Sequence, residues 1–322
     1  MSSSLSRVVS NQSSIKTTKP RVASEPSLMV RPFTHGQESE VLSFLEASPL
    51  HTVFMRGLIR DNGLQSPRNR GAFCGCRDRE GLLHGVALIG HATLFEARNE
   101  AVIRAFAEEA QKQANIHMVI GEQQPVEVFW KSYVENGQQP RRVCSELLLE
   151  QEKPIPVHES VAALRRATIE DLGRVMPIQS QMAFAESGVN PMEVDLAGFQ
   201  QRCARRIELG RVWVCVEKET LTFKADIMSE TPDVIYLEGI YVDPSHRGNG
   251  YGLGCLAQVS ENLLRSARSL CLFVNEQYTE AQEFYSRAGF TMRSRYSTIF
   301  LEPRSSRATI GTLETRDQGA TL

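Results

Sequence analysis

A strand that leads through a glycine-rich loop into a helix is the feature that most constrains this chain. The run from Tyr236 to Ser260 reads YLEGIYVDPSHRGNGYGLGCLAQVS. Its first part, up to Val242, is rich in β-preferring residues, and Pro244 ends the strand because proline has no N–H to donate. After the glycines, apolar residues recur at helical spacing. This order predicts an anion site, since glycines let backbone N–H groups at a helix N-terminus face a phosphate.

Two common kinds of phosphate loop do not fit this run. A nucleoside-triphosphate loop ends in Gly-Lys-Ser/Thr, whereas Gly252 is followed by Leu253, Gly254 and Cys255. The dinucleotide fingerprint G-x-G-x-x-G would need its third glycine at the position of Leu253. The sequence therefore excludes both of these nucleotide-binding motifs.

The run does resemble motif A of the GNAT superfamily of acyl-CoA N-acyltransferases, whose core is Arg/Gln-x-x-Gly-x-Gly/Ala. Here the core is Arg247, Gly250 and Gly252, preceded by the V-x-P of Val242-Asp243-Pro244. A second block resembles the family's motif B, with Asn275 ending a strand and A-x-x-F-Y-x-x-x-G-F running from residue 281 to residue 290. Two motifs in the family's order identify residues 161–303 as a member of this superfamily.

The resemblance implies an α/β (α+β) GNAT fold, in which helices flank a mixed, mostly antiparallel central sheet. It implies acetyl-CoA as co-substrate and no metal. The pyrophosphate would lie on the loop amides, and the pantetheine arm would pair with the strand edge. The implied cofactor-binding residues are Ile240, Tyr241 and Val242 in the strand, Arg247, Gly248, Asn249, Gly250, Tyr251, Gly252 and Leu253 in the loop, and Asn275 and Tyr278 after the next strand. Tyr278 departs from the family's pattern, which commonly has a second Asn there.

Two side chains are candidates for proton transfer. An ammonium group must lose a proton before it attacks a thioester, and Glu238 in the strand before the loop could take it directly or through a water. The alternative is a solvent-facing acid in an alternating strand. Tyr285, in the second motif, is implied as the acid that protonates the leaving thiolate, and its alternative is a core aromatic residue. Because Cys255 and Cys271 fall on core-facing positions, we expect direct attack in a ternary complex.

The first half has a related order of elements. Helices are expected near residues 39–45, 100–113 and 126–133, and strands near 73–76, 83–89, 116–120 and 143–149. This order favours a second, degenerate GNAT-like domain over residues 28–150, hence a tandem arrangement. Residues 90–94, after the second strand, hold no glycine loop. Two prolines at 154 and 156 suggest a semi-rigid linker over 151–160, before the catalytic domain at 161–303.

The two ends of the sequence are expected to be loose tails, at residues 1–27 and 304–322. The first is rich in Ser and Thr and has no acid before Glu25, a composition that is unable to build a core and is also typical of transit peptides. Because Lys and Arg number 36 against 38 Asp and Glu, no nucleic acid partner is expected. No apolar run approaches a membrane span, and the scattered Cys and His residues offer no zinc ligand set. A cytoplasmic protein without a membrane partner is expected.

The sequence thus predicts an acetyl-CoA-dependent N-acetyltransferase that acts on a primary amine of a small molecule or a protein. A non-catalytic acetyl-CoA-binding sensor is one alternative, and a tandem GNAT transferase with another acyl donor is a second. Acceptor specificity is expected to reside in residues 183–207. The acceptor and the oligomeric state, with a homodimer as one option, stay open.

Overall fold

The computed structural model describes residues 28–114, 116–157 and 161–303. The two expected tails and residues 158–160 of the expected linker lie outside this range. In the described part, twelve strands form one sheet in the order β1-β2-β3-β4-β5-β12-β6-β11-β10-β9-β8-β7. Only the pairs β4–β5 and β10–β11 are recorded as parallel. The sheet is therefore mixed and mostly antiparallel, as predicted.

The longest strands are β6, β9 and β12, and the shortest is β7. In chain order, the strands are β1 (Met29–Pro32), β2 (Gly71–Arg77), β3 (Leu83–Gly90), β4 (Ala92–Ala97), β5 (Met118–Glu122), β6 (Pro140–Gln151), β7 (Arg165–Arg166), β8 (Val212–Glu217), β9 (Thr220–Glu230), β10 (Val234–Val242), β11 (Ser269–Asn275) and β12 (Thr291–Leu301).

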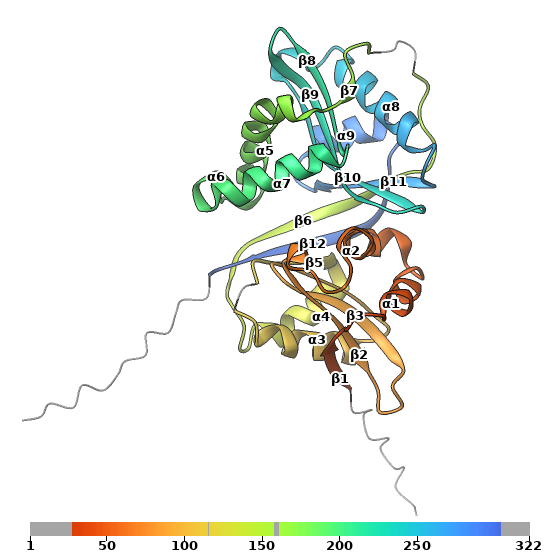
Figure 1. The fold of residues 1–322 in the computed structure, drawn as a ribbon, viewed down its shortest axis with the longest axis vertical. Helices are drawn as coiled ribbons and strands as arrows, with labels where there is room; N and C mark the ends of the chain where they lie inside the picture. Colours follow the sequence, from red (N-terminus) through yellow and green to blue (C-terminus); the bar gives the residue numbers. More distant parts are fainter. Residues whose placement is uncertain (1–27, 115, 158–160, 304–322) are drawn as a thin grey trace, which may run out of the picture.

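Helices flank the sheet on both halves (Figure 1). They are α1 (Glu38–Leu45), α2 (Pro49–Asn62), α3 (Glu100–Gln111), α4 (Gln123–Tyr133), α5 (Leu172–Ser187), α6 (Pro191–Val194), α7 (Leu196–Glu208), α8 (Tyr251–Leu263) and α9 (Thr279–Arg287), with 3-10 turns η1 (Pro67–Asn69), η2 (Ile169–Asp171) and η3 (Pro244–His246). Each half runs strand, helices, three strands, helix, strand, helix, strand. The chain is thus a tandem repeat of one α/β unit.

The two halves exchange their last strands. β6 ends the first half but pairs with β11 of the second, and β12 ends the second half but pairs with β5 of the first. β6 and β12 also pair with each other over most of their length, and Figure 1 shows both long strands crossing between the halves. Gln151, expected as the first linker residue, is instead the buried last residue of β6 and donates to the carbonyl of Ala288 at 2.7 Å. The predicted boundary therefore does not separate two sheets.

Helix α2 joins the halves a second time. It lies against β9 and β10 of the other half, where Ser229 donates a hydrogen bond to the carbonyl of Val53 at 2.6 Å. A Cβ at Gly57 would meet Ser229 Oγ at 1.8 Å, so only glycine permits this approach. Buried Arg56 pairs with Asp233 at 2.7 Å across the same contact. We infer that the halves form one body.

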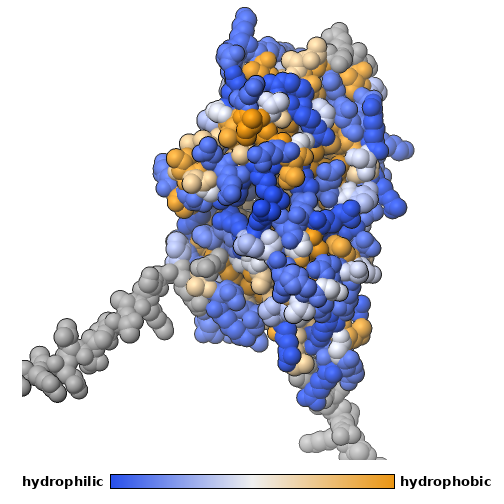
Figure 2. Space-filling model, in the orientation of Figure 1, coloured by the Kyte–Doolittle hydropathy of each residue, from blue (hydrophilic) through white to orange (hydrophobic). Residues whose placement is uncertain are grey.

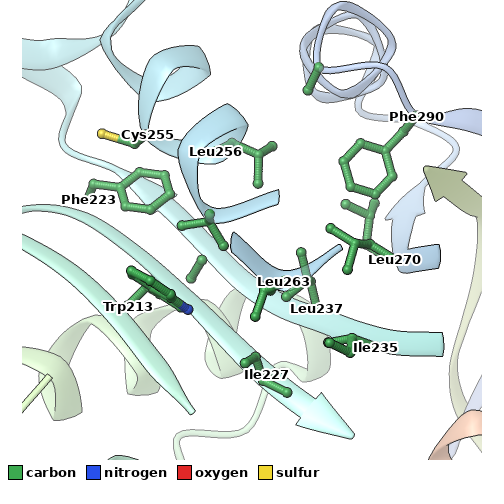
Figure 3. Close-up of a cluster of buried hydrophobic side chains, with 14 of the residues drawn as sticks. Trp213, Phe223, Ile227, Ile235, Leu237, Cys255, Leu256, Leu263, Leu270 and Phe290 are labelled. Carbon is green, nitrogen blue, oxygen red and sulfur yellow. The ribbon is translucent and has the colours of Figure 1, made fainter. Parts of the chain in front are cut away.

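The core of the C-terminal half lies between α8, α9 and strands β8–β11. Figure 3 shows Phe223, Leu237, Leu256, Leu263 and Phe290 converging from these elements. The apolar stripe predicted for the helix after the loop is confirmed. Cys255 and Cys271 are fully buried, as their core-facing positions predicted.

One interpretation of the N-terminal half was wrong. Residues 90–94 were compared with the glycine loop, but Ala92–Ala97 is a strand, β4, that the sequence analysis missed. Its short alternation of small and apolar residues gives a weak strand signal, and Gly90 precedes it closely. The segment that joins β4 to helix α3 is Arg98-Asn99. That junction holds no glycine, and Gly90 is the one glycine of residues 90–94.

Candidate functional site

Strands β10 and β11 separate after three residue pairs, and the region beside the unpaired part of β10, Leu237–Val242, is referred to as the groove. The two strands pair in parallel only at Val234–Tyr236 with Ser269–Cys271. Beyond Tyr236, β10 continues to Val242 with no strand paired to it on this side among the residues that the structure describes. The backbone of Leu237–Val242 is therefore an unpaired strand edge, to which an extended amide-bearing chain can add. Ile240, Tyr241 and Val242, the predicted strand contacts, lie on this edge.

A bulge turns the backbone of β10 inside the groove. Glu238 is opposite Asp226 of β9, and the next pair is Tyr241 opposite Lys224, so the register shifts between them. Gly239 in this bulge has a φ of +61°, and a Cβ there would meet Lys224 Nζ at 2.7 Å. Glycine is required on both counts. The bulge redirects backbone groups that a regular ladder would pair.

A buried ionic network, which the sequence analysis missed, holds this bulge. Lys224 is fully buried and donates to the carbonyl of Gly239 at 3.0 Å. Its Nζ also pairs with Asp226 Oδ1 at 2.8 Å, and Asp226 Oδ2 pairs with Arg206 of α7 at 2.7 Å. An ion pair that is buried and completed by hydrogen bonds fixes geometry more than it adds stability. The network therefore fixes the shape of the groove wall.

The predicted loop leaves β10 through η3 and enters α8 at Tyr251. Gly248 and Gly250 have φ of +81° and +87°, and a Cβ at either would meet nothing within 4 Å. The space above the loop is therefore open. Helix α8 begins with N–H groups that have no intrahelical acceptor, although that of Tyr251 bonds Asn249 Oδ1 at 3.1 Å. The remaining amides, such as those of Gly252 and Leu253, are N–H donors of the kind to which an anion can bond at a helix N-terminus.

Two further loop residues have structural tasks. A Cβ at Gly252 would meet Val242 Cγ2 at 2.6 Å, so glycine lets α8 pack close to the end of β10. The guanidinium of Arg247 is exposed, and its Nε donates to the carbonyl of Val242 at 2.9 Å. Its remaining N–H groups face solvent beside the loop. The structure thus places Arg247 where it can add positive charge to the anion site.

Glu238 lies half-buried in the groove with two other carboxylates. Tyr236 donates to its Oε2 at 3.4 Å. Burial raises the pKa of Glu238, against the opposing effect of Arg206. The pKa of Glu146 is raised by burial and by the charge of Glu238. The pKa of Glu186, at the end of α5, is raised by loss of water around its carboxyl group and by the charges of Glu238 and Glu146. Glu146 and Glu186 were not predicted from the sequence.

Tyr285 projects from α9 beside Phe284 and Phe290, with ring centroids 5.3 and 6.0 Å away. Burial raises the pKa of Tyr285 to about 12, so the phenol keeps its proton at neutral pH. Its ring is half-buried against the core of this half. A phenol in this state can donate a proton.

At the end of β11, the side chain of Asn275 is already bonded within the chain and that of Tyr278 is exposed. Asn275 Oδ1 accepts from the backbone N–H of Gln277 at 2.9 Å, which is the turn-forming role weighed as its alternative. Tyr278 precedes α9 and is 53% exposed. Their contacts with a cofactor stay predictions.

Helices α5, α6 and α7 lie on the opposite side of strands β8–β10 from α8 (Figure 1). Phe184, Val194 and Leu196 in this region are exposed. Figure 2 shows a largely hydrophilic face with apolar areas gathered in the half that carries these helices. This is the region in which acceptor specificity was predicted.

Some kinds of site find no support in the described residues. No group of three or more His, Cys, Asp or Glu side chains is arranged there to hold a metal ion. None of the helices in residues 28–303 that the structure places is long and apolar enough to cross a membrane.

Comparison with known proteins gives a family match for one segment of the chain and a fold match for nearly all of it. Residues 208–292 match the family model described as the acetyltransferase (GNAT) domain. None of the curated proteins matches the chain. The matched segment contains β8 to α9, and thus the groove, the bulge and the loop.

Solved structures match nearly the whole chain. A Drosophila protein has a TM-score of 0.63 at 13% identity, covering 86% of this chain and 99% of its own. A GNAT-family acetyltransferase from Colwellia psychrerythraea has a TM-score of 0.55 at 12% identity, with 85% and 100% covered. A tandem GNAT protein from the clavulanic acid biosynthesis pathway has a TM-score of 0.55 at 14% identity, with 87% and 99% covered. At these identities the similarity establishes the fold.

Proposed function

Because residues 208–292 form a GNAT acetyltransferase domain and the whole chain has the tandem GNAT fold, we propose that this protein is an acetyl-CoA-dependent N-acetyltransferase. It transfers the acetyl group to a primary amine by direct attack within a ternary complex. The observation that carries this proposal is the free edge of β10 beside an open glycine loop at the start of α8.

The loop and the strand edge fit the two parts of coenzyme A. The open space above Gly248 and Gly250 admits a pyrophosphate, whose oxygens accept from the first amides of α8. The pantetheine arm carries amides that pair with the edge of β10. When bound, acetyl-CoA supplies the thioester carbonyl that an amine attacks.

Two side chains move protons in this proposal. Glu238 takes a proton from the acceptor's ammonium group, and its raised pKa brings it closer to neutral pH than an ordinary carboxylate. Tyr285 gives its phenolic proton to the sulfur that leaves, and the second proton lost by the attacking nitrogen restores the phenol, so that the products are an amide and a thiol. The network of Lys224 and Asp226 holds the bulge next to Glu238.

The acceptor approaches from the side of α5–α7. The carboxylates of Glu146, Glu186 and Glu238 on that side favour a protonated amine, since a like-charged cluster is stabilised by a cation. Whether the amine belongs to a small molecule or a protein stays a prediction. So do the cytoplasmic location and the oligomeric state.

Binding of acetyl-CoA tests the proposal most directly. Calorimetric titration of the wild-type protein should give one site per chain. Gly250→Asp places a negative side chain where the pyrophosphate would lie, and we expect it to weaken binding by roughly 100-fold or more.

The chain offers a matched control for this variant. Gly81 has a φ of +86°, almost that of Gly250, and a Cβ there also meets nothing within 4 Å. Gly81→Asp therefore imposes a similar backbone strain far from the loop and should bind acetyl-CoA like the wild type. Absence of binding to the wild type, or equal loss in both variants, would contradict the proposed site.

A further inference from the structure

The N-terminal half has a hollow where β4 and β5 separate. These strands pair in parallel only at Ala92–Thr93 with Met118–Val119. Beyond these pairs they enclose a cavity of about 100 Å³. Its apolar wall includes Met55, Leu94, Ile103 and Ile120, and its polar wall includes His51, Glu96, Glu122 and Tyr296. No role has been given to these residues so far.

The polar groups of this cavity come from elements distant in the sequence. Ser48 donates to Glu96 Oε1 at 2.9 Å, which leaves Oε2 without a partner among the described residues. His51 Nδ1 lies 2.7 Å from the hydroxyl of Tyr296 and 3.8 Å from Glu122 Oε1. Tyr296 belongs to the exchanged strand β12, so the cavity is complete only in the assembled chain.

The charged residues that line the cavity determine whether it favours a cation or an anion. Two carboxylates, Glu96 and Glu122, face one imidazole, and the wall contains no Lys or Arg. Burial raises the pKa of Glu96, and the charge of Glu122 raises it further. A cation in the cavity relieves this unfavourable arrangement, whereas an anion would add to it.

The same half lacks what coenzyme A would need. The first amides of α3 are partly used, because Asn99 caps the helix and its side chain accepts from the N–H of Val102 at 3.1 Å. Glu100 adds a negative charge to the first turn. A phosphate is therefore disfavoured beside the cavity, and its ligand is a small molecule that stays within it.

We propose that this cavity binds a small primary alkylammonium ion. The ammonium group donates to Glu96 and Glu122, and a chain of a few carbon atoms lies against Leu94 and Ile120. The volume is consistent with this size, since a cavity of about 150 Å³ accommodates benzene. The proposal does not depend on acetyl transfer.

The test uses propylammonium chloride as the probe and 1-propanol as its neutral equivalent. Both are titrated against the full chain by ligand-observed NMR. We expect propylammonium to bind about 10-fold or more tightly than propanol, because only the cation gains from the carboxylates. Glu96→Gln should remove most of this difference, and Ala97→Leu, which fills the cavity from the end of β4, should remove binding of both probes.

Two further variants separate this cavity from the acyl-transfer groove. Glu80→Gln, in an exposed turn, should leave the affinity unchanged, whereas Glu238→Gln reports any propylammonium that binds beside β10 instead. Loss of binding in Glu238→Gln but not in Glu96→Gln would overturn the proposal, because the amine would then occupy the groove. Equal binding of propanol, or no binding at concentrations on the order of 100 mM, would also overturn it.

Discussion

Each half of the chain contains a parallel pair of strands that separates. The halves differ in the first strand of that pair, β10 in one and β4 in the other. In both, a parallel pair separates after two or three residue pairs. In the C-terminal half, β9 and β10 shift register at Gly239, and the bulge is held by buried Lys224. In the N-terminal half, β3 and β4 pair without a shift from Gly85–Ala97 to Leu88–Leu94. The separation of strands therefore belongs to the fold, whereas the bulge belongs to the site.

The helices that follow β10 and β4, α8 and α3, differ in how their first turns are capped. The N-cap of α8 is Gly250, beside open space, whereas the N-cap of α3 is Asn99, whose side chain accepts from the N–H of Val102. The N-cap side chain therefore occupies an amide in α3 but not in α8. The comparison teaches that two local departures from regular structure distinguish the proposed acetyl-CoA groove from the cavity of the N-terminal half.

The largest expected effect comes from removing the proposed base. We expect Glu238→Gln to lower kcat between about 100- and 10,000-fold, the range for loss of a general base. The base acts only when deprotonated, and burial raises its pKa above the ordinary value of 4.5. Wild-type kcat should therefore fall as the pH drops through this raised pKa. Steady-state assays of thiol release across pH would measure both effects.

A control and a contradicting outcome sharpen this prediction. Glu80→Gln, in an exposed turn of the N-terminal half, should keep the wild-type pH profile. An acidic limb that persists unchanged in Glu238→Gln would assign the titration to another group, with Glu146 as the first candidate.

The second prediction concerns Lys224, the buried lysine that bonds to the bulge of β10 in the C-terminal half. Lys224→Met leaves Asp226 with Arg206 alone and the carbonyl of Gly239 without its donor. We expect a loss of about 3 kcal/mol in the free energy of unfolding, typical of breaking a buried ion pair. Urea denaturation measures this loss, and kcat at a temperature where the variant is folded should fall because the bulge relaxes.

Exposed Lys112 provides the matched substitution. It pairs with Glu109 on the surface of α3, and Lys112→Met should leave the free energy of unfolding unchanged, since exposed ion pairs contribute little to stability. A Lys224→Met protein with lowered stability but wild-type kcat and affinity for acetyl-CoA would limit the network to a structural role.

The fold class and the loop were predictable because their signals are local. Glycines at 248, 250 and 252 between a β-rich run and a helical stripe suffice to predict strand, loop and helix, and the structure has them in that order. Thr168 and Asp171 likewise form a capping box at the start of η2, where the N–H of Thr168 donates to Asp171 at 2.8 Å. Local chemistry decides such features.

The strand exchange and the ionic network were not predictable, because both depend on distant partners. β6 and β12 have similar strand patterns, and nothing in either sequence says which half each will complete. Glu146 on β6 therefore reads as a solvent-facing acid, although it enters the groove of the other half. Lys224 reads as an exposed position of an alternating strand, but α5 and α7 cover that face and bury it completely. Only tertiary contacts assign these residues.

The smallest expected effect tests the closed helix start of the N-terminal half. Asn99→Ala removes the cap of α3, and we expect a loss of about 1 kcal/mol in the free energy of unfolding. Thermal or urea denaturation measures it, with Glu80→Ala in the exposed turn as the reference. Calorimetry on the same variant should still give one acetyl-CoA per chain, because freeing one amide supplies neither a glycine loop nor a bulge. A second bound equivalent would mean that the cap alone separates the two halves, and that the regular pairing of β3 with β4 is no obstacle to the cofactor.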